Sequence, residues 1–145
     1  MNISKHFTLD DVQFNEMAIR YGISNELPDE LYENAELLAE ELLEPLYEKH
    51  NDIIITSWYR SEPLEREYCR HSYLRWCVAN RMPMNEYSWY DYLAIKPHVT
   101  AQAVTLRYTE TIFNTLKEME FTTLQKKDWI SVSYVKGQLD RRVIE

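Results

Sequence analysis

The chain has 145 residues, of which 45% are hydrophobic and 28% charged, and this length and composition suit one domain with a hydrophobic core. Its formal net charge of −8 argues against a general nucleic-acid binder or a ligand of acidic membranes, because phosphate binding needs a basic face. The first residues lack the apolar core of a signal peptide, and no run approaches the roughly 18 apolar residues of a membrane span. We therefore expect a cytoplasmic protein.

The cysteines and glycines exclude further classes of protein. Cys69 and Cys77 stand eight residues apart on an expected helix, at about 12 Å, which is too far for a disulfide. Gly22 and Gly137 are the two glycines of the chain. With so few, the sequence holds no glycine-rich loop that could bring backbone close to a phosphate or a dinucleotide.

The first third of the chain predicts helices. One helix is expected from Thr8, with Asp11 completing a capping-box-like start, to Gly22. Its inward face would consist of Val12, Ala18 and Tyr21. The clearest helix covers residues 29–50, where apolar residues recur at helical spacing, and Pro45 is expected to kink or tighten it.

Strands and helices then alternate. The predicted segments, in chain order, are a buried strand over Ile53–Thr56, a helix over 63–82, a short helix and loop over 83–98, a strand over 103–108, a helix over 109–120, a strand over 128–134 and a loose polar tail over 135–145. Because helices come first and strands are scattered among later helices, the expected class is α+β, in a single domain over 1–145.

Four segments occur in an order that carries a resemblance: "SKHFTLDD", "LLEPLYEKHNDIIITSWYRS", "HVTAQAVTL" and "DWISVSY". In this order and spacing the chain resembles the VanY-like D-Ala-D-Ala metallopeptidases, particularly the short form common in bacteriophages. The resemblance covers about residues 4–134, and 67–95 match less well. It implies the small zinc-peptidase (Hedgehog-like) fold, in which N-terminal helices pack on one side of a central antiparallel sheet.

The family pattern reads S-x-H-x-x-G-x-A-x-D, followed later by an acidic residue three positions before a second histidine. Two histidines and one carboxylate hold zinc and leave its fourth position to water, whose pKa the metal lowers. The acidic residue acts as a general base beside that water. An arginine at the end of the "tSgYRS" strand helps to hold or polarise the substrate.

Carried onto this chain, the pattern places His98 at the first histidine, Ala103 at the alanine, Asp128 at the general base and Arg60 at the arginine. The other two ligand positions hold Thr105 in place of the carboxylate and Ser131 in place of the second histidine. Three further departures are Lys96 for the serine before the histidine, Ala101 for the glycine of the pattern and Trp58 for the glycine of the arginine turn.

Threonine and serine hydroxyls are neutral, weak zinc ligands, so His98 alone is not a zinc site. We therefore predict a pseudoenzyme without a cofactor, in which Arg60 and Asp128 are vestigial catalytic residues. Its binding cleft is expected to be one small pocket of a few hundred Å³ at most. The predicted cleft residues are Arg60, His98, Thr105, Asp128 and Ser131.

The sequence is compatible with three functions. The first is a non-catalytic, phage-encoded protein in the host cytoplasm or the virion, which binds or inhibits a host protein, a virion partner or a peptidoglycan peptide. The second is an active zinc D-Ala-D-Ala peptidase or endolysin with altered ligands. The third is a binder of small anions that uses Arg60, His98 and Lys96 in the emptied cleft.

Single residues also have alternative interpretations. The alternative for His98 is a leftover polar residue satisfied by Thr105 or Ser131. Arg60 is then a structural arginine paired with an acidic residue of the cleft, and Asp128 a strand-end cap or the partner of Arg60. A nucleophilic constellation of Ser131, His98 and Asp128 is conceivable if the hydroxyl points at the imidazole.

Two features lie in or near the less family-like segment. Cys69, His71 and Cys77 are a weak candidate for a replacement metal site, because their spacing fits no standard zinc pattern. Aromatic residues, with Met82 and Met84, form the candidate partner-binding face, because such residues supply binding hot spots. The aromatic members of this face are Trp76, Tyr87, Trp89, Tyr90 and Tyr92.

Overall fold

The computed structural model describes all 145 residues and begins with a helical layer. Its elements are α1 (Leu9–Gln13), α2 (Glu16–Tyr21), the 3-10 turn η1 (Asp29–Leu31), α3 (Tyr32–Leu38), the π-helical turn η2 (Ala39–Leu43) and α4 (Glu44–Lys49). From η1 to α4 they run on as the one long helix that the sequence predicts. The single helix predicted from Thr8 is divided, because Phe14 is extended and Asn15 caps a new helix through the amide of Ala18.

Both predicted ends of that N-terminal region are confirmed. Thr8 and Asp11 form a capping box, and Gly22 ends α2 in the left-handed conformation at φ 64°. Val12 and Ala18 are buried as predicted, whereas Tyr21 is exposed. Residues 12 and 21 belong to separate helices on either side of Asn15, so they do not form one helical face.

Pro45 explains the π-helical turn in the middle of the long helix. Proline has no amide hydrogen and cannot continue the hydrogen-bond ladder of an α-helix. Immediately before it, Glu44 donates its amide to the carbonyl of Ala39, five residues back. The helix thus widens by one residue ahead of the proline and continues as α4 without a break in its buried face.

A five-stranded sheet forms the other half of the body. Its strands are β1 (Ile55–Ser57), β2 (Ala103–Arg107), β3 (Thr123–Lys126), β4 (Trp129–Ser133) and β5 (Arg142–Ile144), in the spatial order β1-β2-β4-β3-β5. β1–β2, β2–β4 and β4–β3 pair antiparallel, whereas β5 pairs parallel to β3. The sheet is therefore mixed, which corrects the expectation of a wholly antiparallel sheet. Residues 142–144 of the expected loose tail form its last strand.

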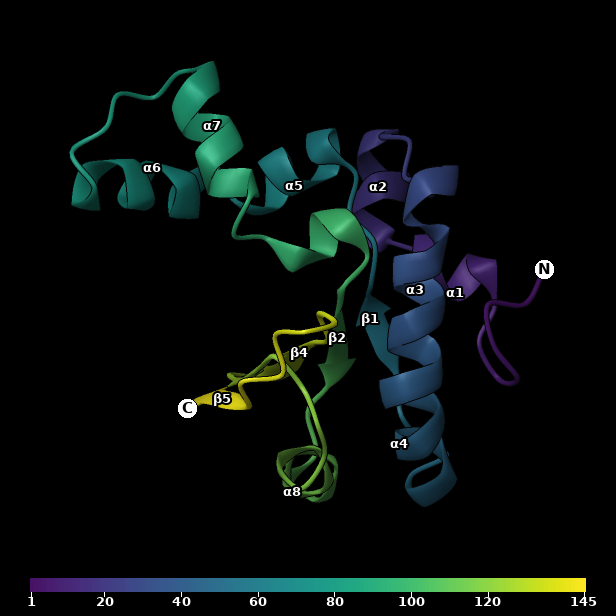
Figure 1. Cartoon of the computed structure of the whole chain (residues 1–145). Helices are drawn as coiled ribbons and strands as arrows, with labels where there is room; N and C mark the ends of the chain where they lie inside the picture. The colour runs from purple at the N-terminus through teal and green to yellow at the C-terminus, as the bar shows by residue number, and fades with distance from the viewer.

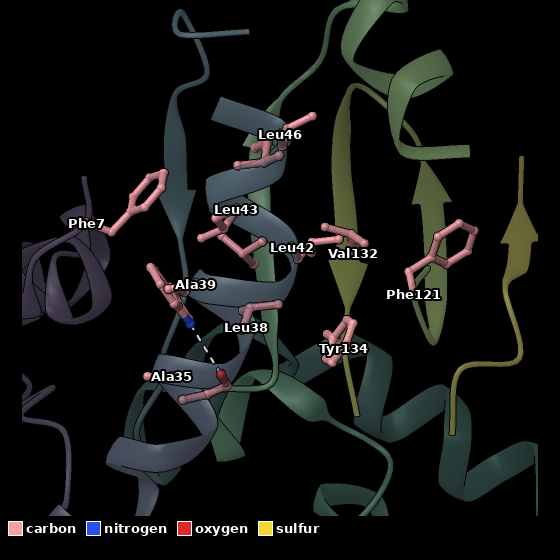
Figure 2. Packing of buried hydrophobic residues seen from close by; sticks show 14 of the residues in the cluster. Phe7, Ala35, Leu38, Ala39, Leu42, Leu43, Leu46, Phe121, Val132 and Tyr134 are labelled. Atoms are coloured by element: carbon pink, nitrogen blue, oxygen red, sulfur yellow. Dashed lines mark hydrogen bonds between the residues drawn. The ribbon is translucent and has the colours of Figure 1, made fainter. Parts of the chain in front are cut away.

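The long helix covers one face of this sheet (Figures 1 and 2). The core is one cluster of 23 buried residues that joins the leucines of this helix to the inward side chains of the strands. Figure 2 shows Leu38, Leu42 and Leu46 on the helix beside Val132 of β4. Helix α8 (Glu110–Lys117) adds Ile112, Phe113 and Leu116 to the same core.

Between β1 and β2 the chain leaves the body and returns. This excursion, here called the arm, consists of α5 (Glu62–Tyr68), α6 (Arg70–Ala79) and α7 (Glu86–Leu93) and leads back through the 3-10 turn η3 (Pro97–Thr100). Figure 1 shows α6 and α7 standing away from the sheet and the long helix. The helix predicted over 63–82 is interrupted at Cys69, whose backbone is not helical at φ −107° and ψ 14°.

The observed class is α+β, as predicted from the order of the elements. β1 begins two residues later than the expected strand, and Ile54 before it is exposed rather than buried. None of the helices combines the length and apolar character needed to span a membrane.

Candidate functional site

The free face of the sheet forms the floor of a cleft. Alternate side chains of a strand point to opposite faces of the sheet. One set of side chains fills the core, and the other set faces solvent in this cleft. The floor is polar and consists of Thr105, Ser131, Ser133, Thr123 and Gln125. The base of the arm and the turn η3 supply the walls, with Arg60, Tyr68 and His98 among the lining residues. The cleft volume of about 1120 Å³ exceeds the few hundred Å³ expected.

His98 is held in one orientation at the inner end of this cleft. Its Nδ1 lies 2.7 Å from the carbonyl oxygen of Trp58, and because a carbonyl only accepts, Nδ1 carries the proton. Nε2 is then a lone-pair nitrogen, and the hydroxyl of Thr105 donates to it at 3.2 Å. The imidazole is therefore anchored by backbone on one side and directed at β2 on the other.

The surroundings keep His98 neutral. Burial, followed by the positive charges of Arg60 and Lys96, lowers the pKa of its imidazole from 6.5 to about 3. The hydrogen bond to the Trp58 carbonyl favours the protonated ring but does not compensate for these effects. At neutral pH the ring is an acceptor at Nε2 and carries no charge.

Thr105 and Ser131 lie directly opposite each other on β2 and β4. Residues paired in this way on antiparallel strands present their side chains on the same face of the sheet. The structure thus brings His98, Thr105 and Ser131 together at one end of the cleft floor. The interpretation of His98 as satisfied by the Thr105 hydroxyl is confirmed by the distance between them.

Arg60 is fixed by four contacts in the wall beside His98. Its backbone amide donates to the His98 carbonyl at 3.1 Å, and its Nε donates to Ser57 Oγ at 3.0 Å. Its Nη1 lies 3.3 Å from Glu65 Oε2, and its guanidinium stacks 4.0 Å above the Tyr68 ring. The expected pairing of Arg60 with a carboxylate is confirmed, and the partner is Glu65.

Glu65 was not identified from the sequence. It is fully buried, and its second oxygen accepts from Cys69 Sγ at 2.7 Å. Burial, and then the neighbouring Glu65 carboxylate, raise the pKa of the Cys69 thiol to about 11, so this cysteine is not a nucleophile at neutral pH. Glu65 stands in a run of charged residues typical of a solvated helix, and no local signal marks it as buried.

Asp128 lies outside the cleft. It is exposed at the turn between β3 and β4 and does not line the cavity, so its placement among the cleft residues and its pairing with Arg60 are both wrong. A constellation of Ser131, His98 and Asp128 does not form, because the Trp58 carbonyl and the Thr105 hydroxyl occupy the two ring nitrogens.

The candidate metal site on the arm does not assemble either. Cys69 and Cys77 are buried, whereas His71 is exposed on α6. Cys69 contacts Glu65, and Cys77 lies 3.8 Å from Ser88 Oγ.

The candidate partner face divides into two groups. Trp89 and Tyr92 are buried with Cys69 in the small core of the arm, and Trp76 packs half-buried against them, so these rings are not an open surface. Tyr87 and Tyr90 are exposed, as are Leu74, Val78 and Met84 nearby.

Searches of known protein families, of curated proteins and of solved structures found nothing that matches this chain.

Proposed function

We propose that this protein is a non-catalytic binding protein on the scaffold of the VanY-like D-Ala-D-Ala metallopeptidases, with the metal site lost. One observation carries the proposal: Thr105 donates to His98 Nε2, and Ser131 lies directly across from Thr105. These are the three positions that the resemblance assigns to metal ligands, and they hold only one imidazole. The likeness to short bacteriophage enzymes supports a phage-encoded protein that binds a protein or a peptidoglycan peptide.

Zinc does not fit the donor set of this cleft. Catalytic zinc sites use three ligands drawn from histidine, cysteine and carboxylates, whereas positions 98, 105 and 131 offer one histidine and two neutral hydroxyls, and the buried Glu65 is already engaged by Arg60 and Cys69. No three side chains of these ligand types gather anywhere in the chain in a way that could hold a metal ion. The exposed position of Asp128 also leaves the cleft without the general base that the family uses.

The first test is metal content and peptidase activity. Protein purified without a metal-binding tag is expected to contain no stoichiometric zinc by elemental analysis and to release no D-alanine from D-Ala-D-Ala peptides. About one zinc per chain, lost in His98→Ala, or a chelator-sensitive release of D-alanine would instead support the alternative of an active peptidase with altered ligands.

The second test rebuilds the site. Thr105→Asp combined with Ser131→His returns a carboxylate and an imidazole beside His98 Nε2, and zinc should then raise the melting temperature, because ligand binding stabilises the folded state. The parent should show no shift. The matched control is Thr105→Asp with Ser133→His, which places the imidazole two residues farther along β4, on the same face of the sheet and opposite Ala103. A well-folded Thr105→Asp/Ser131→His protein without a zinc-dependent shift would contradict the interpretation of a dismantled metal site.

A second candidate function, the binding of small anions, is supported by the charge at the inner end of the cleft. Arg60 and Lys96 both line the cleft with His98, and their charges lower the pKa of its imidazole. Titration with inorganic phosphate or acetate, followed by the melting temperature, tests this candidate. A shift that is lost in Lys96→Gln would support it.

A further inference from the structure

The cleft carries positive charge in a protein that is negative overall. Two cations, Arg60 and Lys96, lie at its inner end beside His98 and are here called the inner cations. Two more, Arg107 and Lys127, line its outer end and are here called the outer cations. Two carboxylates, Glu16 and Glu65, also line the cleft, whereas the whole chain has 24 acidic residues against 16 lysines and arginines.

Three of these four cations have no carboxylate partner. Glu65 pairs with Arg60, and none of the other ion pairs in the chain involves Lys96, Arg107 or Lys127. Aromatic rings hold two of them in place: the Lys96 ammonium lies 4.8 Å from the Tyr92 ring centre, and that of Lys127 lies 5.5 Å from the Trp129 ring centre. Such cation–π contacts position a charge without neutralising it.

The outer cations lie farther along the strands than the inner end of the cleft does. Arg107 lies opposite Trp129, just as Thr105 lies opposite Ser131 two residues earlier on the same face. Alternate residues of an extended chain are about 7 Å apart. A strand-like ligand lying over the floor can therefore bring alternate acidic side chains to the inner and the outer cations. The floor hydroxyls and the Gln125 amide supply donors and acceptors for its peptide groups.

We infer that the cleft binds an acidic peptide segment in an extended conformation, through internal carboxylates that meet the inner and the outer cations. This inference rests on the proposed non-catalytic function. The cavity of about 1120 Å³ is larger than the roughly 300–1,000 Å³ of small-molecule sites, which favours a peptide over a single small anion. A nucleic acid is disfavoured, because three unpaired cations offer few phosphate contacts on a protein with a net charge of −8.

The test uses a fluorescein-labelled pentapeptide, Glu-Thr-Glu-Thr-Glu, blocked at both ends so that it has no terminal carboxylate. Fluorescence anisotropy should show saturable binding that weakens as salt is added. Two analogues, in which Gln or Lys replaces each Glu (the Gln-Thr and Lys-Thr analogues), should bind at least tenfold more weakly than the acidic peptide. Arg107→Glu with Lys127→Glu should weaken the binding of the acidic peptide at least tenfold, whereas Arg107→Lys should retain most of it.

The control variant is Arg75→Glu with Arg81→Glu, which makes the same change of charge at exposed positions on the arm. It should change the affinity less than threefold. The inference would be overturned if the control and the cleft variant lost the same affinity, or if the Gln-Thr analogue bound as tightly as the acidic peptide. Tighter binding of labelled pentathymidylate, or no binding of the acidic peptide, would also overturn it.

The same assay in the presence of a chelator separates this inference from the proposed function. Binding that persists with chelator supports both. Peptide binding that requires zinc would overturn the proposed loss of the metal. Absence of peptide binding from a zinc-free, inactive protein would overturn this inference and leave the proposed function in place.

Discussion

The body and the arm of this molecule are stabilised in different ways. The body buries 23 residues in one core between the long helix and the sheet, whereas the arm gathers its aromatic rings around three buried residues, Cys69, Trp89 and Tyr92. Exposed apolar side chains are frequent on the arm, including Val78, Met84 and Tyr87. Regions with few buried apolar contacts open locally at a lower free energy than the global core does. The arm should therefore be the less stable of the two regions.

The comparison also shows where the two regions meet. The base of the arm forms a wall of the cleft, because Glu65 holds Arg60, and Tyr68 hydrogen-bonds to the buried Asn15 at 3.0 Å. The return through η3 supplies His98 and Lys96. The cleft is thus built at the junction, with its floor on the stable sheet and its walls on the arm. Ligand binding there should stabilise the arm more than the body.

The largest effect is expected in the body. Leu42 is fully buried between helix and sheet, and Leu42→Ala should lower the free energy of unfolding by about 2–5 kcal/mol. Urea denaturation measures this loss, and Leu74→Ala on the exposed surface of the arm is the control, with an expected change within about 0.5 kcal/mol. Similar losses in both variants would contradict the assignment of the core to the body.

The junction should make stability depend on pH. The His98 imidazole has a pKa of about 3 in the folded protein against 6.5 in the unfolded chain. Between these values the unfolded chain binds more protons, so the free energy of unfolding falls as the pH falls, by up to about 1.4 kcal/mol per pH unit. Above pH 6.5 this contribution is constant.

His98→Gln should remove that slope. Denaturation of the parent and the variant at several pH values between 4 and 7 measures the difference between them. His71→Gln, on the exposed surface of α6, is the control that removes one imidazole without touching the cleft. If the slope persists in His98→Gln, this ring is not the buried neutral group that the geometry indicates.

A smaller global effect is expected from the core of the arm. Truncation of a fully packed tryptophan costs about 3–5 kcal/mol in a main core. In the arm, however, the loss cannot exceed the free energy that holds this region closed, so Trp89→Ala should change the global transition by only about 1–2 kcal/mol. Hydrogen exchange of the α7 amides should accelerate strongly while that of β2 and β4 does not. A loss as large as that of Leu42→Ala would show that arm and body unfold as one unit.

The sequence predicted the parts of the fold that carry strong periodic signals. The long helix over 29–50 and the strands β2 and β4 were found, because their apolar residues face one large core. β3 was missed, since its outward residues Thr123 and Gln125 line the cleft and Leu124 is its single buried apolar residue. β5 was missed because its three residues pair through backbone in a polar segment.

The candidate site was predictable where it depends on the order of motifs and not where it depends on distant contacts. The order of motifs predicts that His98, Thr105 and Ser131 share one cleft, and Thr105 both contacts His98 and lies opposite Ser131. Glu65 and the exposed position of Asp128 do not follow from it. The first depends on how the arm folds back onto Arg60, and the second on the turn between β3 and β4, where β3 had not been predicted.

The smallest effect is expected where the chain returns from the arm to the sheet. Ala101 is fully buried and has a left-handed backbone with φ 60°. For a residue with a Cβ this conformation costs roughly 1–2 kcal/mol, which glycine avoids. Ala101→Gly also loses a buried methyl group, worth about 0.8 kcal/mol, and makes the unfolded chain more flexible by about 0.5–1 kcal/mol. These effects nearly cancel, so Ala101→Gly should lie within about 1 kcal/mol of the parent.

Ala103→Gly is the matched control for that substitution. Ala103 is equally buried two residues later, at the start of β2, and has no left-handed backbone to relieve. Ala103→Gly loses the same methyl group and makes the unfolded chain more flexible by the same amount. The free energy of unfolding of this variant should therefore fall by about 1–2 kcal/mol. Urea denaturation of both variants measures the difference, which isolates the strain at residue 101. Equal losses of unfolding free energy at the two positions would mean that the backbone at residue 101 is not left-handed. The orientation of His98, three residues earlier in η3, would then be wrong as well.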